Sequence, residues 1–307
     1  MLFHIVKLNN LQKQLSQNVI ASRASALRCN PVATIKFWIA SRPKVARNDG
    51  SAHTQVKWYG YIFLLLLLLA SPAWSAGNVK TPNVEKGLLE VENKGRYQID
   101  EAAARNSKKE LEFNVSYGVT ERWKTKIEAV VDETPSGDLT YRRTRFENVF
   151  QLTKSKNGAW LDTALYNDFT IADRSDSSHD VMFGVLARKD IDATTSTGNI
   201  YVRRDFGDTA KQGTNFVYRW QTKYNVSPAF QPGFEILGDT RKRDAFRDQT
   251  LGIGPGVYGS VGLDKIAPEL FNDKNQKFGY EVVYTFGATP VTPDGTLKWK
   301  LKYAVQF

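Results

Sequence analysis

The last eleven residues of this chain alternate between apolar and polar side chains. Apolar residues hold every second position, and the positions between them are mostly lysines. Because successive side chains of a β-strand point to opposite faces, the pattern predicts a strand with one apolar face and one cationic face. The apolar face must lie against a protein core or against lipid. The apolar residues are Leu297, Trp299, Leu301, Tyr303, Val305 and Phe307, and the lysines are Lys298, Lys300 and Lys302.

The aromatic end of this segment favours the lipid alternative over a soluble β-sandwich. An alternating strand of about ten residues that finishes on an aromatic residue resembles the last strand of bacterial outer-membrane β-barrels. In that class the apolar face contacts lipid and the polar face lines the lumen. The resemblance implies that Tyr303, Val305 and Phe307 form the signal through which the barrel-assembly machinery recognises the C-terminal strand.

An apolar run near residue 60 has the form of a secretory signal peptide. Lys57 precedes the run Tyr61–Ala70, and small residues follow it over Ser71–Ala76. Ten apolar residues are too few for a transmembrane helix, which needs roughly 20, so a retained anchor is the weaker alternative. The Ala-Trp-Ser pattern predicts cleavage after Ser75, with cleavage after Ala76 as the second choice.

The chain therefore divides into three parts. Residues 1–55 show no strand alternation and are predicted to be a dispensable or wrongly included extension, 56–76 the signal peptide, and 77–307 the barrel. Most of the formal charge of +10 falls before residue 77, which leaves 33 bases and 31 acids in the barrel. Nucleic-acid binding is therefore not expected. The single cysteine, Cys29, also lies upstream, so the barrel has no disulfide.

From about residue 87 the chain consists of alternating segments separated by turn residues. Their length of about ten residues matches the 9–11 that cross a bilayer, whereas strands of soluble proteins average five or six. The pattern predicts an all-β, antiparallel, transmembrane up-and-down barrel of about 12 strands, with ten or fourteen also open because 264–275 is long for a periplasmic turn. The expected strands are 87–100, 109–119, 123–132, 139–153, 159–172, 181–191, 199–206, 214–226, 230–240, 250–263, 276–286 and 297–307.

Four segments carry a more specific resemblance. Residues 286–297 with the terminal strand, 251–255, 277–281 and 111–122 are similar to a family of uncharacterised proteobacterial outer-membrane barrel proteins. Relatives of that family are loosely attached to the meta-pathway of phenol degradation. The resemblance covers about 87–307 and implies the fold and an outer-membrane location in a Gram-negative bacterium, while it says little about the solute.

If the apolar positions face lipid, charges of both signs face the lumen. A pore whose basic residues attract anions is one outcome. A salt-bridged plug, with the terminal lysines tied to Glu281 and Glu235, is the other. The expected function is a narrow channel for small, anionic or aromatic solutes. The candidate pore-lining residues are Arg143, Arg145, Arg203, Arg219, Lys223, Lys298, Lys300, Lys302 and Glu281.

A non-transporting structural or surface-binding barrel is the alternative function. Its contact surface would be the loops 173–180 and 241–249, and the basic residues Arg241 and Arg243 would meet lipopolysaccharide phosphates. An enzyme is not expected, because the only histidine after residue 76 is His179 in a polar loop. The sequence predicts no catalytic, cofactor-binding or metal site.

Overall fold

The computed structural model describes the barrel part of the chain. The described residues are 77–102, 106–133, 138–173, 177–210, 213–240, 249–269, 271 and 274–307. The predicted extension, signal peptide and cleavage site lie outside them. Within the described residues, no helix is long and apolar enough to cross a membrane.

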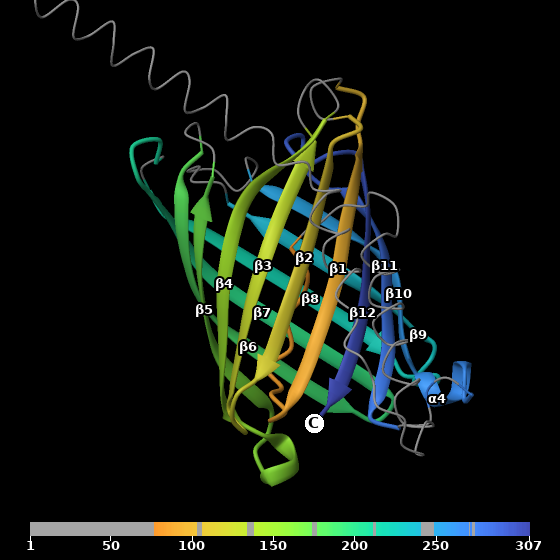
Figure 1. Ribbon diagram of the computed structural model, residues 1–307. Coiled ribbons are helices and arrows are strands. Elements are labelled where there is room, and N and C mark those ends of the chain that lie inside the picture. The colour runs from red at the N-terminus through yellow and green to blue at the C-terminus, as the bar shows by residue number, and fades with distance from the viewer. Residues whose placement is uncertain are drawn as a thin grey trace, which may run out of the picture. The chain divides into compact units, whose positions relative to one another are not determined.

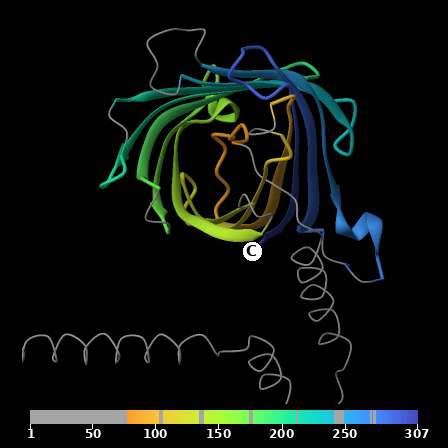
Figure 2. The same cartoon turned by 90° about the horizontal axis from the view of Figure 1, so that it is seen from above.

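Twelve antiparallel strands form one closed barrel, in which each strand pairs with its neighbours in the sequence (Figures 1 and 2). The predicted fold class and strand number are confirmed. The strands are β1 (Leu88–Ile99), β2 (Lys109–Gly118), β3 (Trp123–Glu133), β4 (Leu139–Thr153), β5 (Asp162–Ala172), β6 (His179–Ile191), β7 (Thr194–Phe206), β8 (Asn215–Tyr224), β9 (Gln231–Asp239), β10 (Thr250–Gly262), β11 (Gln276–Gly287) and β12 (Gly295–Gln306).

The barrel closes where the last strand meets the first. β12 runs antiparallel to β1, and their register extends from Leu88 opposite Gln306 to Ile99 opposite Gly295. The N–H of Phe307 then donates to the carbonyl of Gly87 at 3.1 Å. Closure removes the free sheet edges, so backbone groups on both sides of every strand have partners.

The two faces of the barrel wall differ in polarity. Large apolar side chains such as Phe183, Ile200 and Phe216 are exposed on the outside, and Ile200 keeps 65% of its surface accessible. Charged side chains such as Glu128 and Glu235 are buried inside. The period of two that the sequence shows therefore becomes an apolar exterior and a polar lumen.

Two connections differ from the sequence prediction. The predicted loop 192–198 is a two-residue turn, Asp192 and Ala193, and β7 begins at Thr194. This part of β7 was missed because its threonines, serine and glycine show no apolar period, although threonine favours strands. The described residues between 264 and 275 contain no continued strand and give no sign of a miscount, because this connection begins with the short helix α4 (Leu263–Ile266).

The barrel has two ends, which we call proximal and distal. The proximal end is the one at which β1 starts and β12 finishes, and the distal end is the one at which β1 turns into β2. The residues of the predicted assembly signal lie at the proximal end. The hydroxyl of Tyr303 donates to Gln276 at 3.0 Å, Val305 pairs with Leu89, and Phe307 is 78% exposed.

Deletion of Phe307 is expected to impair assembly more than stability. Its side chain makes little contact with the folded barrel, yet it ends the strand that closes the sheet. We expect lower levels in the outer membrane, more periplasmic degradation, and an unfolding midpoint in urea close to that of the wild type for the protein that does assemble. Unchanged levels in the membrane fraction would contradict an assembly role.

Candidate functional site

The N-terminal residues of the described chain lie inside the barrel. Residues 77–86, which we call the strap, precede β1 and run through the lumen, where Figure 2 shows them in orange within the ring of strands. Val84 of the strap keeps only 2% of its surface accessible. The sequence of this segment predicts no role for it, because it contains no alternating pattern and no recognised motif.

Side chains of three strands hold the strap by its main chain. Asn199 of β7 makes a double contact with Lys80: its Oδ1 accepts from the Lys80 N–H at 2.7 Å, and its Nδ2 donates to the Lys80 carbonyl at 2.8 Å. Gln151 of β4 accepts from the Val84 N–H at 2.9 Å. Arg219 of β8 donates to a third main-chain group, the carbonyl of Asn78, at 2.9 Å. The strap is therefore fixed near both ends and in the middle.

An apolar cluster on one side of the lumen receives the strap. Val84 packs there, and burying a valine side chain contributes about 1.5–3 kcal/mol. The tyrosine rings of the cluster meet edge to face, with centroids 5.1 Å apart. The wall side chains of the cluster come from β4 to β8 and are Val149, Ala164, Tyr166, Met182, Leu186, Tyr201 and Val217.

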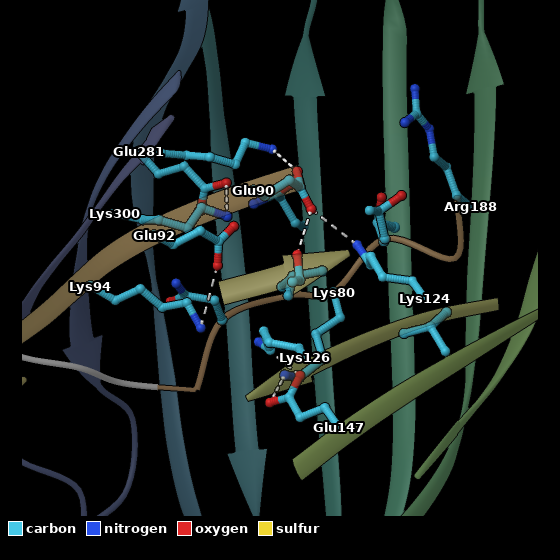
Figure 3. Close-up of a pocket in the computed structure, with 18 of the residues that line it drawn as sticks. Lys80, Glu90, Glu92, Lys94, Lys124, Lys126, Glu147, Arg188, Glu281 and Lys300 are labelled. Atoms are coloured by element: carbon cyan, nitrogen blue, oxygen red, sulfur yellow. Dashed lines mark hydrogen bonds and ion pairs between the residues drawn. The ribbon is translucent and has the colours of Figure 1, made fainter. Parts of the chain in front are cut away.

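The lumen face of β1 to β4 carries a network of ion pairs beside this cluster. Lys94 of β1 contacts Glu112 at 3.2 Å and Glu128 at 2.9 Å. Lys126 contacts Glu147 at 2.7 Å, and Lys80 of the strap reaches the same carboxylate at 2.6 Å (Figure 3). Buried charges are tolerated when each has a partner, and this network supplies the partners. Lys80 thereby joins the strap to the charged side of the lumen.

The described residues enclose a proximal and a distal cavity in the lumen, and Lys80 lines both of them. The proximal cavity has a volume of about 250 Å³ (Figure 3). The distal cavity, which the strap reaches with Gly77, has a volume of about 630 Å³. Lys80 of the strap is therefore the residue that the two linings share.

Both cavities have more basic than acidic side chains in their described lining. The proximal cavity is lined by Lys80, Lys94, Lys124, Lys126, Arg188, Lys223, Lys300 and Lys302 and by the carboxylates Glu90, Glu92, Glu147 and Glu281. The distal cavity is lined by Lys80, Arg96, Arg142, Arg143, Arg145, Arg203 and Arg219 and by Glu110, Glu112, Asp168, Asp180, Asp205 and Asp239. The excess of positive charge is larger in the proximal cavity.

The predicted pore-lining residues are distributed over both cavities. The residues that line the distal cavity are Arg143, Arg145, Arg203 and Arg219, and those that line the proximal cavity are Lys223, Lys300, Lys302 and Glu281. Lys298 lines neither cavity and is buried in the wall.

The three lysines of β12 each have a carboxylate partner. Lys298 contacts Glu235 at 2.5 Å, Lys300 pairs with Glu281, and Lys302 contacts Glu90 at 2.8 Å. Pairing with Glu235 and Glu281 is the arrangement expected for a salt-bridged lumen. The β12 lysines therefore do not form a ladder of free positive charges.

Part of the ion-pair network was not among the predicted site residues. Glu90, Glu92 and Lys94 of β1 face the lumen at a spacing of two residues. That spacing was visible in the sequence, but Asn93 and Gly95 interrupt the apolar face of the same strand and obscure its pattern. A search for polar as well as apolar alternation finds these residues.

The comparisons with known proteins concern the barrel type. No protein-family model and no curated protein sequence matches this chain. Among solved structures, a "KdgM porin" matches at 11% identity and a TM-score of 0.43, with 71% of this chain and 99% of that chain covered. A "NanC porin" matches at 10% identity and 0.43, with 71% and 100% covered. An "anion-selective porin from Comamonas acidovorans" matches at 7% identity and 0.34, with 72% and 98% covered.

These identities and TM-scores are too low to transfer a function. The assignment of the fold rests on the strand pairing of this chain itself, which closes from β12 to β1.

Removal of the charge of Lys298 is expected to destabilise the barrel strongly. The Lys298→Met change leaves Glu235 buried without its cation, and breaking a buried pair in this way costs about 3–5 kcal/mol. The double change Lys298→Met with Glu235→Gln removes both charges and is expected to recover most of that loss. Urea unfolding of the detergent-solubilised proteins measures both. Equal stability of the single variant and the wild type would contradict the pairing.

Proposed function

We propose that this protein is an outer-membrane channel for small anionic solutes and that the strap closes it in the conformation described above. The proposal is supported above all by two lumen cavities that have Lys80 in common and more basic than acidic residues in their described lining. Basic lining raises the local concentration of anions in a confined passage.

The exterior of the barrel supports the membrane location. Every strand has at least nine residues, which suffices to cross a bilayer at a tilt. Exposed aromatic side chains lie near both ends, with Tyr117 and Tyr224 near the proximal end and Tyr141 near the distal end. Aromatic residues at both interfaces are typical of transmembrane barrels. Lipid and lipopolysaccharide are therefore the surroundings that we propose.

A sealed, non-transporting barrel is the second candidate. The observation in its favour is that ion pairs and the strap occupy much of the lumen, as in a plugged barrel. A structural or surface-binding role would then fall to the distal loops. Residues 241–248, with their basic side chains, lie outside the described residues, so lipopolysaccharide contact through them stays a prediction.

Loosening the strap is expected to increase ion conductance. The Asn199→Ala change removes two hydrogen bonds to Lys80, and the Lys80→Ala change removes the contact with Glu147. At about 1 kcal/mol for each hydrogen bond, loss of two shifts the equilibrium towards the open state by about thirtyfold. Conductance of the purified protein in planar bilayers measures this shift against the wild type.

A matched control is available on the outer wall. Asn167 accepts a hydrogen bond from Asn148 and does not contact the strap, so Asn167→Ala is expected to leave the current unchanged. If wild type and both strap variants conduct no ions, the sealed barrel is the correct alternative. If Asn167→Ala raises the current as much as Asn199→Ala does, the effect is not specific to the strap.

The direction of the strap also bears on signal cleavage. The strap leaves β1 at the proximal end and reaches the distal cavity with Gly77. If the signal peptide of some twenty residues were not cleaved, it would have to pass through the lumen before the strap could bind there. We therefore expect the mature protein to begin at Ala76, or failing that at Gly77. N-terminal sequencing of membrane-extracted protein checks this, and a start upstream of Val56 would contradict it.

A further inference from the structure

Two cations on β8 are held without a carboxylate partner. The side chains of Arg219 and Lys223 point to the lumen from the same face of the strand. The guanidinium of Arg219 lies over the ring of Tyr201, 5.2 Å from its centroid, and the ammonium of Lys223 lies 5.4 Å from the ring centroid of Tyr258. Among the described residues, no Asp or Glu forms an ion pair with either cation.

A tyrosine ring holds a cation differently from a carboxylate. The ring attracts the cation through its quadrupole but carries no net charge, so the cation keeps its full positive charge. A carboxylate partner carries the opposite charge, so an ion pair attracts a distant anion much less than an unpaired cation does. The β12 lysines, which pair with Glu235, Glu281 and Glu90, are therefore neutralised by direct contact, whereas Arg219 and Lys223 have no contacting carboxylate among the described residues. The carboxylate that acts most strongly on Lys223 is Glu281, and it is in contact with Lys300.

The two cations are placed along the route between the cavities. Arg219 lines the distal cavity and Lys223 lines the proximal cavity. Four residues of strand separate them, which corresponds to about 13 Å. Arg219 donates one N–H to the strap carbonyl of Asn78. A guanidinium has five N–H donors, so others remain available to a solute. Each cavity thus contains one cation that keeps donors for a solute.

We propose that Arg219 and Lys223 form a two-step binding track for small organic carboxylates, which bind at one cation and then at the other. This proposal rests on the proposed channel function. It assigns the anion selectivity of the channel to residues of β8 instead of residues of β12. Two binding sites of moderate affinity in series suit conduction, because a solute must bind tightly enough to enter and weakly enough to leave.

Direct binding of benzoate to the purified mature protein tests the track. Calorimetric titration in detergent measures the Kd of benzoate, with benzyl alcohol as the uncharged ligand of similar shape. The Lys223→Gln and Arg219→Gln variants are each expected to raise the Kd of benzoate at least tenfold or to abolish binding. Lys223→Arg keeps the charge and is expected to retain binding, which separates loss of charge from misfolding.

The matched control removes an ion pair that does not act on Lys223. The double change Arg203→Gln with Asp239→Asn leaves the net charge of the distal cavity unchanged and is expected to alter the Kd by less than threefold. The same titrations at 0.1 and 0.5 M KCl distinguish direct contact, which persists, from a general field, which salt screens.

The outcomes separate the track from the channel. If benzoate binds and Lys223→Gln weakens it, but no ion current is found in bilayers, the track stands as a binding site and the channel function fails. If current is found but benzoate binds equally well to Lys223→Gln and Arg219→Gln, the track is overturned. Equal weakening by the Arg203 and Asp239 control, or binding of benzyl alcohol as tight as that of benzoate, also overturns it.

Discussion

Backbone pairing between β12 and β1 is the constraint on which the rest of this structure depends. Without it, both strands would present unpaired N–H and C=O groups, and an unpaired group in hydrocarbon costs several kcal/mol. With it, the sheet has an inside and an outside, and the period of two sorts every strand between them. The apolar residues face outwards and the charged residues are enclosed in the lumen.

The lumen that encloses these charges must also be filled. The lumen of a twelve-stranded barrel is too wide for its wall side chains alone to fill. The strap fills part of it and matches both kinds of surface: Val84 packs into the apolar cluster of β4 to β8, while Lys80 contacts the carboxylate of Glu147 on β4. A segment with only apolar or only charged residues would leave one side unsatisfied.

The lumen contains two kinds of cation, and the difference matters for function. Most cations, such as Lys94 and Lys298, contact carboxylates and mainly stabilise the wall. Arg219 and Lys223 rest on aromatic rings and keep their charge. A count of basic residues therefore overstates the attraction of the lumen for anions, and the partner of each residue is the better guide.

Local pattern in the sequence determined the closed β-architecture, because the period of two and the turn residues act within a single strand. The strand Leu139–Thr153 was predicted with the bounds that it has, and the inward orientation of the β8 and β12 cations followed from the same period. The tertiary structure alone decided which charges meet. Lys302 pairs with Glu90 across more than two hundred residues, and the strap contacts Asn199 from more than a hundred residues away. Such contacts depend on the radius and register of the closed barrel, which no local pattern in one strand contains.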